Sequence, residues 1–398
     1  MKNNKIIFLT PTMDIGGGER VVSEMSLNLN ENIEKIIIVF ESINNKISYP
    51  YRGKLISLNL VISSNFLLKI YYFFLGLFKT WKIIMKEKPS YVISLGGQLN
   101  IINVLTNKRA LVRVENFIPM FNSFRERMYG ILIKILFNRA NKVIVVSKTI
   151  ANSLIENFGI KKEKIKLIYN PIDIKKIQSL ALEPLESKHQ EIFNNSLVII
   201  NIGRVTEIKG QWCLIKAFKE VKNKIKEAKL VILGKGGLEK KLKKLIKDLN
   251  LENDVYFLGW QENPFKFLYK SKLFVLASLG GEGLPCIILE AMACGIPIIS
   301  TDCKSGPREI LAPKTDFNYE TKKIEYVEYG VLAPVCSGKF NITNLLPSQS
   351  EKTLSQALIN MLDDKELLSK LKSKSEQRAQ DFGVKKIIKE WDFLAKNY

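Results

Sequence analysis

Short runs of apolar residues alternate with longer amphipathic segments along the whole chain. Most of the segments between the runs have the apolar spacing of helices, as Leu238–Leu249 does. Continuous apolar strands that alternate with helices are typical of parallel sheets covered on both faces. The runs that predict such strands are 6–9, 35–40, 91–94, 110–114, 142–146, 197–202, 230–233, 255–258, 273–277 and 297–300.

These strands are too many for one compact doubly wound sheet, and the alternation stops between about Pro171 and Asn195. That stretch is polar and also contains Pro184, which is typical of a linker. The pattern therefore predicts an α/β protein with two Rossmann-like domains, 1–175 and 195–375, that face each other across a cleft.

One segment, Phe66–Met85, departs from this alternation because it is almost continuously apolar. It is nearly long enough to span a bilayer, but Lys69, Lys79 and Lys82 argue against spanning. On a helix these lysines and Lys86 share one sector. The other side carries Phe66, Ile70, Phe73, Phe74, Leu77, Phe78, Trp81 and Met85. Such a helix fits either an interfacial membrane anchor or a core helix with a lysine-edged outer face.

Charge adds an expectation about partners. The chain has 398 residues, and Lys+Arg 61 against Asp+Glu 39 gives a net charge of +22. This excess indicates an acidic partner, which is nucleic acid, anionic lipid or a phosphorylated substrate, unless it reflects a background rich in lysine and asparagine.

Cysteine and histidine usage excludes several classes of chemistry. The five cysteines form no C-x-x-C pair, so metal cages and disulfide frameworks are not expected, and a reducing compartment fits. The start of the chain lacks a signal-peptide pattern, which favours the cytoplasm. The single histidine, His189, lies in the polar stretch, so we expect no serine–histidine triad, histidine base or histidine metal site.

Two glutamates, Glu282 and Glu290, lie in a segment that is otherwise mostly small and apolar. The run 273–277 predicts a strand, and the residues from about Pro285 predict a helix that ends near Gly295. Glu282 then follows a strand, while Glu290 lies about one and a half turns into the helix. Both are expected at the crevice where open α/β sheets bind ligands.

The turn before this helix is a candidate anion site. The backbone amides of Gly283 and Leu284 would point out of the helix N-terminus. Two carboxylates beside such a site would accept hydrogen bonds from sugar hydroxyls. The alternative is an exposed Glu282 and a salt-bridged Glu290 without a function.

Three further turns follow predicted strands. Arg204 and Lys209 in "NIGRVTEIKG" are two cations suited to a diphosphate, or else two solvated charges. Gly234 opens a glycine-rich turn whose pattern alone is too common to specify phosphate binding. Gly16–Gly18, in "DIGGGERVV", would let the backbone approach a ligand closely. No nicotinamide fingerprint or P-loop is present.

Together these motifs resemble the retaining glycosyltransferases of family four, which have the GT-B fold. The resemblance covers nearly the whole chain. The family pattern of two glutamates with seven residues between them matches Glu282 and Glu290, its diphosphate-binding arginine and lysine match Arg204 and Lys209, and its glycine-rich loop matches Gly16–Gly18. The segments "GWQENPFKFLYKSKLFVLAS" and "STDCKSGPREIL" resemble bacterial N-acetylgalactosaminyltransferases of lipid-linked oligosaccharide assembly.

The resemblance implies a role for each residue. Arg204 and Lys209 would stabilise the leaving diphosphate, Glu290 would bind the ribose and Glu282 a sugar hydroxyl, with no metal or cofactor required. Gly234 and the Gly283–Leu284 amides would also hold the donor. The last residues, 380–398, resemble a terminal helix that crosses back to the first domain.

The chain departs from the family at one position. Where many members have a histidine after the strand at 110–114, this chain has Asn116, preceded by Glu115. An asparagine hydrogen-bonds a sugar hydroxyl but transfers no proton, which leaves Glu115 as a substitute to consider.

The expectation is therefore a metal-independent retaining hexosyltransferase, peripheral at the inner face of the cell membrane. Its donor would be a UDP-N-acetylhexosamine or UDP-hexose, its acceptor a lipid-linked saccharide, and its further partner an anionic membrane surface. The rivals are a UDP-sugar 2-epimerase of the same fold and a basic nucleic-acid-binding protein. An epimerase would need further acid–base groups, and a lone histidine in a polar stretch counts against it. A nucleic-acid-binding protein would need a recognisable binding module, and the sequence shows none.

Overall fold

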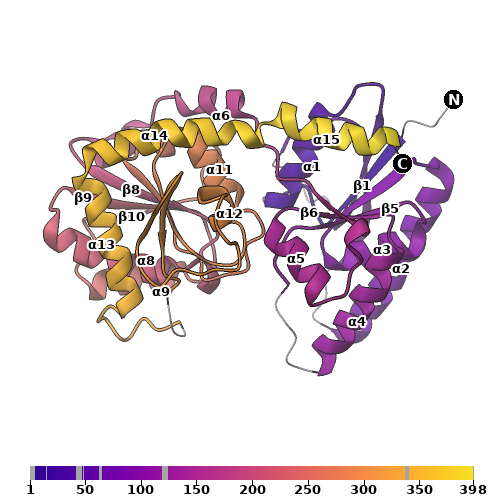
Figure 1. Cartoon of the computed structure of the whole chain (residues 1–398), viewed down its shortest axis with the longest axis horizontal. Coiled ribbons are helices and arrows are strands. Elements are labelled where there is room, and N and C mark those ends of the chain that lie inside the picture. Colours follow the sequence, from indigo (N-terminus) through magenta and orange to yellow (C-terminus); the bar gives the residue numbers. More distant parts are fainter. Residues whose placement is uncertain are drawn as a thin grey trace. The chain divides into compact units, whose positions relative to one another are not determined.

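The computed structural model describes residues 5–14, 16–41, 47, 49–61, 65–118, 124–336 and 340–397 (Figure 1). The chain divides into two compact units. Unit 1 comprises Met1–Pro171 and Val384–Tyr398, and unit 2 comprises Ile172–Gly383. Each unit contains a mainly parallel sheet covered by helices, so the prediction of an α/β protein with two Rossmann-like domains is confirmed.

Unit 1 has a seven-stranded sheet of order β3-β2-β1-β4-β5-β6-β7, and all its pairings are parallel. The order reverses at β1, whose neighbours β2 and β4 lie on opposite sides of it. The strands are β1 (Lys5–Thr10), β2 (Glu34–Glu41), β3 (Lys54–Leu60), β4 (Tyr91–Leu95), β5 (Ala110–Val114), β6 (Lys142–Val145) and β7 (Ile165–Leu167).

Helices cover the two faces of this sheet with separate cores. Apolar residues of α1 (Gly17–Asn28) and α15 (Val384–Asn397) share one core with β1, and residues of α2 (Phe66–Glu87) and α3 (Gly97–Thr106) share the other. The terminal helix α15 thus belongs to unit 1. The unit also contains α4 (Phe124–Arg139), α5 (Lys148–Glu156) and the short 3-10 helix η1 (Lys162–Lys164).

The predicted helix at Phe66–Met85 forms α2, but most of its apolar sector does not pack on the core. Its N-terminus is capped by Asn65, whose side chain accepts hydrogen bonds from the amides of Leu67 and Leu68. Gly76, Thr80 and Ile84 are the buried residues of the helix. The exposed large apolar residues are Phe66, Leu67, Leu68, Ile70, Tyr71, Phe74, Phe78, Trp81 and Met85. Among the described residues, every helix is too short or too polar to cross a bilayer.

Unit 2 repeats this architecture with the sheet order β10-β9-β8-β11-β12-β14-β13. The order reverses at β8, and only β13 runs antiparallel to its neighbour among the pairings of the described strands. The strands are β8 (Leu197–Ile202), β9 (Ala228–Leu233), β10 (Val255–Gly259), β11 (Leu273–Leu276), β12 (Ile298–Thr301), β13 (Glu325–Val327) and β14 (Gly330–Ala333).

The helices of unit 2 bury nearly all of their apolar faces. One core combines the sheet with α8, α9, α13 and α14, while α6, α10 and α11 contact one another. The helices are α6 (Ile174–Ala181), α7 (Ser187–Phe193), α8 (Gln211–Lys224), α9 (Glu239–Asp248), α10 (Phe265–Lys270), α11 (Cys286–Ala293), α12 (Pro307–Leu311), α13 (Gln349–Asp363) and α14 (Lys365–Ala379), with the 3-10 helices η2 (Glu207–Lys209) and η3 (Gln380–Phe382).

The stretch predicted as a linker is folded. It holds α6 and α7, so unit 2 begins at Ile172 rather than near residue 195, and it extends to Gly383 rather than residue 375. His189 lies in α7, buried against the ring of Phe267, with its Nδ1 3.1 Å from Glu186. Burial lowers the pKa of this histidine, which suits a neutral packing role.

Candidate functional site

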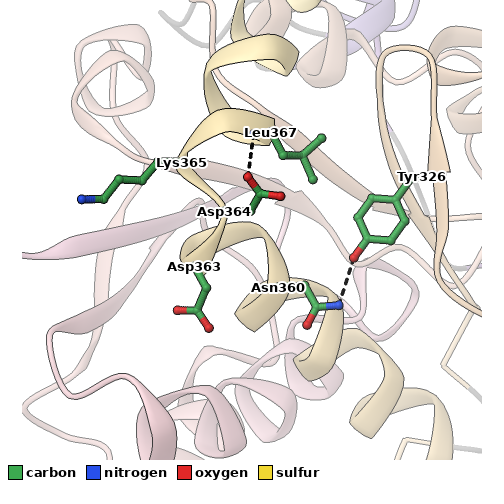
Figure 2. A pocket seen from close by; sticks show the side chains of 6 residues that line it. All are labelled: Tyr326, Asn360, Asp363, Asp364, Lys365 and Leu367. Carbon is green, nitrogen blue, oxygen red and sulfur yellow. Dashed lines mark hydrogen bonds between the residues drawn. The ribbon is translucent and has the colours of Figure 1, made fainter.

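One surface hollow is lined by none of the predicted residues. It has a volume of about 540 Å³ and lies in unit 2 at the junction of α13 and α14 (Figure 2). Its polar groups serve the fold, because Asp364 caps α14 through the Leu367 amide and Asn360 donates to the Tyr326 hydroxyl. The lining residues are Tyr326, Asn360, Asp363, Asp364, Lys365 and Leu367.

The predicted cations lie instead at the carboxyl end of β8, where the strand order of unit 2 reverses. Such switch points are where open α/β sheets bind ligands. The loop after β8 is fixed to the end of β11, since the Leu279 amide donates to the Ile208 carbonyl at 2.7 Å. Gly210 has a φ of +63°, and a Cβ there would lie 2.0 Å from the Ala277 carbonyl oxygen. Only glycine permits this close approach of the two loops.

Lys209 and Glu282 meet at this edge. The Lys209 Nζ lies 2.6 Å from Glu282 Oε1, and the Ser278 hydroxyl donates to the same oxygen at 2.5 Å. The side chains of Lys209 and Glu282 are 22% and 9% exposed, so the pair is largely buried and the lysine is the more accessible partner. An ammonium has three donors and a carboxylate has two oxygens. The pair therefore retains donors on the lysine and Oε2 on the glutamate for a ligand.

The other residues of the loops around β8 differ in their surroundings. Arg204 is exposed, while the Gln211 side chain donates to its backbone carbonyl at 3.0 Å, so a fixed backbone carries a solvated guanidinium. Gly234 has a φ of +136°, and a Cβ there would lie 2.0 Å from the Gly203 carbonyl oxygen. This packing of the β9 turn on the β8 turn explains Gly234 without a ligand.

The segment around the two predicted glutamates is buried. The helix α11 begins at Cys286, with Pro285 as its N-cap rather than its first residue. Glu290 is 5% exposed in the second turn of this helix. Burial of the Cys294 thiol, and to a smaller extent the negative charge of Glu290, raise the pKa of that thiol to about 12. The thiol therefore stays neutral.

A loop after β12 fixes the predicted anion-binding turn. The Ser305 hydroxyl donates to the carbonyls of Gly283 and Glu282 at 2.8 and 3.2 Å. A Cβ on Gly306 would lie 2.8 Å from the Gly283 carbonyl oxygen. Gly283 and Leu284 are both buried, so their positions are set by packing before any ligand arrives.

An ion network anchors that loop in turn. The Arg308 guanidinium contacts Asp302 Oδ2 at 2.5 Å and Glu325 Oε2 at 2.6 Å, and Asp302 also accepts from the Thr321 amide at 2.7 Å. Arg308 and Asp302 are 4% and 3% exposed. Burial opposes the charge on Arg308, but its hydrogen bonds to the two carboxylates raise its pKa overall. Ser305 and Arg308 both lie in the segment "STDCKSGPREIL", but that segment was singled out only for its resemblance, and neither residue was predicted as part of the site.

In unit 1 the glycine-rich turn adjoins the end of β5. Gly16 caps α1, and a Cβ on Gly18 would lie 2.5 Å from Glu115 Oε2. Glu115 therefore occupies the space that a larger residue at position 18 would fill. Burial raises the pKa of Glu115, with a smaller contribution from Glu19 in the same direction. Asn116 is exposed, and Gly17 has open space around its Cα.

Glu115 rests on a buried arginine. The Arg113 side chain is fully buried, with its Nε 3.5 Å from Glu115 Oε1. Its guanidinium also bonds to the Asn170 side chain and lies 5.8 Å from the ring centre of Trp391 in α15. The pair at 3.5 Å partly opposes the rise in the pKa of Glu115. The sequence singled out Glu115 only through its neighbour Asn116, and gave no signal for Arg113.

Comparison with protein families places the two units in related groups. Residues 15–176 match the model described as Glycosyltransferase Family 4, and residues 183–325 match that described as Glycosyl transferases group 1. Each match falls largely within one unit, and the second stops before the last part of unit 2. They disfavour both rivals, the epimerase and the nucleic-acid-binding protein.

Two curated relatives align over most of the chain. An uncharacterized glycosyltransferase of Methanocaldococcus jannaschii is 38% identical over 91% of this chain and 87% of its own. The N-acetylgalactosamine-N,N'-diacetylbacillosaminyl-diphospho-undecaprenol 4-alpha-N-acetylgalactosaminyltransferase of Campylobacter jejuni is 30% identical over 78% of this chain and 74% of its own.

Among solved structures, Anabaena HepE in complex with UDP superposes with a TM-score of 0.75 at 18% identity. The alignment covers 99% of this chain and 100% of that one. At this identity the likeness establishes the fold, which is the GT-B arrangement of two Rossmann-like units.

Proposed function

Because the chain belongs to the group 1 glycosyltransferase family, we propose that it moves a hexose or N-acetylhexosamine from a UDP-sugar to a lipid-linked saccharide. The observation that carries the proposal is the contact of Lys209, Glu282 and Ser278 at the strand-order reversal of unit 2. The relative from Campylobacter jejuni is named for an acceptor of this kind, and HepE was crystallised with UDP.

In the proposed reaction the departing diphosphate gains negative charge as the bond to the sugar breaks. Lys209 and Arg204 stabilise that charge, and the Gly283–Leu284 amides add hydrogen bonds. Glu282 keeps the Lys209 ammonium in place through a 2.6 Å contact, so the cation is oriented before the donor binds. The free oxygen of Glu282 accepts a hydroxyl of the transferred sugar.

The remaining donor contacts come from α11 and the glycine turns. Glu290 accepts the ribose hydroxyls of the nucleotide. In unit 1, Asn116 hydrogen-bonds a sugar hydroxyl, and the open space at Gly17 admits a saccharide close to the backbone. The product keeps the anomeric configuration, and the cations stabilise the leaving group without a metal ion.

The proposed acceptor places the enzyme at the cytoplasmic face of the membrane, as a peripheral protein. Support comes from α2, whose exposed aromatic sector adjoins exposed lysines at positions 69, 82 and 86. Such a helix suits an anionic interface. Lys79 does not take part, because its Nζ donates to the Leu58 carbonyl at 2.8 Å.

Transfer of radiolabel from a panel of nucleotide sugars to cell membranes tests the function directly. We expect label from a UDP-hexose or UDP-N-acetylhexosamine to enter the organic extract as a lipid-linked saccharide. A Lys209→Met protein serves as the inactive control. Label that remains water-soluble with every donor, or that enters only with a non-UDP donor, would contradict the proposal.

A further inference from the structure

A second helix of unit 1 presents apolar side chains to solvent. Met128, Ile131, Leu132 and Ile135 of α4 are 51%, 51%, 41% and 53% exposed. Their spacing places them on one side of the helix. The opposite side, with Ile133 and Phe137, is buried. The helix is thus apolar on both sides, and its outer stripe has no cover in the described part of the chain.

This stripe and the exposed sector of α2 belong to the same layer of helices. Helix α3 contacts both α2 and α4, so the three helices lie side by side on one face of the sheet (Figure 1). Leu105 of α3, the helix that contacts the other two, is 49% exposed. We call the whole set the apolar surface: Phe66, Leu67, Ile70, Tyr71, Phe74, Phe78, Trp81, Met85, Leu105, Met128, Ile131, Leu132 and Ile135. So many exposed large apolar residues on one layer of helices mark an interaction site rather than ordinary exposure.

The charges beside the apolar surface are mostly positive. Exposed cations include Lys82 and Lys86 on α2 and Lys134 and Arg139 on α4. The only acid on α2 is Glu87, whose carboxylate is already bound by Lys5 at 2.7 Å and by Lys54. A partner that matches both features is apolar inside and anionic at its boundary, which describes an anionic bilayer.

We propose that α4 inserts into the membrane interface together with α2, so that the bilayer contacts a two-helix surface rather than one helix. The inference rests on the proposed membrane-bound acceptor. Tyr71, Trp81 and Tyr129 suit it, because tyrosine and tryptophan favour the headgroup level. Two helices in contact with the bilayer fix the orientation of unit 1 on the membrane. A single helix would let the unit rotate about the helix axis.

The two helices contribute in different ways. The lysines beside the α2 sector attract anionic headgroups, and this attraction weakens with salt. The stripe of α4 carries no charge among its four side chains, so its contribution is apolar and insensitive to salt. High salt therefore isolates the part of the affinity in which α4 matters most.

The test compares vesicle binding of three full-length variants without donor. Ile131→Ser/Ile135→Ser removes the α4 stripe, Lys82→Gln/Lys86→Gln removes charge from α2, and Leu182→Ser is a control at a 69% exposed position in unit 2. On vesicles of phosphatidylglycerol and phosphatidylcholine we expect the isoleucine variant to bind about tenfold more weakly at both low and high salt. The lysine variant loses affinity at low salt only, and the control binds like the wild type.

Wild-type affinity of the isoleucine variant, with its unchanged circular dichroism, would overturn the proposal. So would a wild-type dimer that the same two substitutions dissociate, because the stripe would then bind a second copy. Transfer to a short-chain, water-soluble acceptor is measured separately. If the wild type does not transfer sugar to this acceptor, the proposed function is refuted. Vesicle binding would still decide the role of α4.

Discussion

The two units contain sheets of nearly the same strand order but carry opposite charge at equivalent places. After the first strand of unit 2 stand two cations, Arg204 and Lys209, of which one is held by a carboxylate. After the first strand of unit 1 stands a glycine turn against the carboxylate of Glu115. The strand order decides where a ligand binds. The residues at that edge decide which ligand it is, which is why the proposed diphosphate contacts lie in unit 2 and the proposed sugar-hydroxyl contact of Asn116 lies in unit 1.

Among the described residues, each unit also buries one arginine, and the two have different partners. Arg308 of unit 2 is paired with the two carboxylates of Asp302 and Glu325. Arg113 of unit 1 contacts an amide and an indole, and its nearest described carboxylate oxygen is 3.5 Å away. Arg308 neutralises the buried charge of Asp302, whereas Arg113 lies against Glu115 at a longer distance.

The largest effect is expected from removing the better-paired arginine. Arg308→Met leaves Asp302 buried without its cation, which costs about 3–5 kcal/mol of stability. Arg113→Met removes a cation that lies 3.5 Å from the carboxylate of Glu115, so we expect a smaller loss. Urea unfolding followed by circular dichroism measures both. Equal losses would mean that the two arginines have the same role.

The cation pair of unit 2 should decide turnover rather than stability. Lys209→Met or Arg204→Ala removes a positive charge that stabilises the leaving diphosphate. The loss costs about 2.7–4 kcal/mol of transition-state stabilisation, or roughly 100- to 1000-fold in kcat. Lys247→Met, an exposed lysine on α9, is the matched control and should keep its rate. Near-wild-type rates for both site variants would remove the cations from the mechanism.

Glu115→Gln tests the hypothesis that Glu115 acts as a carboxylate in place of the histidine that many family members have at the next position. A hydrogen bond to a charged group is worth about 1.5–3 kcal/mol, so the rate should fall by roughly 10- to 100-fold. Burial raises the pKa of Glu115 above its usual 4.5. The active carboxylate is then lost as the pH falls through that raised value, and the acid limb of the kcat/KM profile lies above 4.5.

The same limb should vanish in Glu115→Gln, because the amide does not titrate. The groups that face Glu115 are Arg113, which opposes the rise in its pKa, and Glu19, which adds to it. Glu19→Gln should therefore move the limb of the wild type to lower pH. An unchanged limb in Glu115→Gln would assign it to another group.

The smallest effect separates the two glutamates of unit 2. Glu290→Gln keeps the shape of the ribose contact and loses its charge, so UDP should bind about fivefold more weakly, or about 1 kcal/mol. Glu282→Gln should lower the rate while UDP affinity changes little, since Glu282 contacts the sugar. Calorimetry with UDP measures both affinities. Identical UDP affinity in Glu290→Gln and the wild type would remove the ribose assignment.

Most strands could be predicted because buried parallel strands are continuous apolar runs. The misses have physical reasons. The strand Lys54–Leu60 alternates polar and apolar residues at the edge of its sheet, while Ile165–Leu167 and Glu325–Val327 are short edge strands. Edge strands bury less and so carry a weaker apolar signal. Gly330–Ala333 is a buried interior strand, but its four residues are too few to stand out as an apolar run.

The sequence suggested which residues belong to the candidate site but not which of them contact one another. Arg204, Lys209 and the two glutamates were identified from motifs and resemblance. The pairing of Lys209 with Glu282 was not, because it joins positions 73 apart through loops whose paths depend on Gly210. Ser278 and Ser305 carry no signal of their own, since hydroxyls that position a backbone are common in any turn. The polar composition of 172–194 likewise hid two helices that pack on unit 2.

The last helix has a consequence for how the protein is made. Ile387, Trp391 and Leu394 of α15 complete one core of unit 1, and the Tyr91 hydroxyl donates to the Leu394 carbonyl at 3.3 Å. The ribosome releases these residues only after all of unit 2 has been synthesised. Unit 2 is therefore complete before unit 1, although its translation begins later. Until α15 is synthesised, one core of unit 1 remains uncovered. Nascent chains stalled before residue 384 should hold a protease-sensitive unit 1 beside a resistant unit 2.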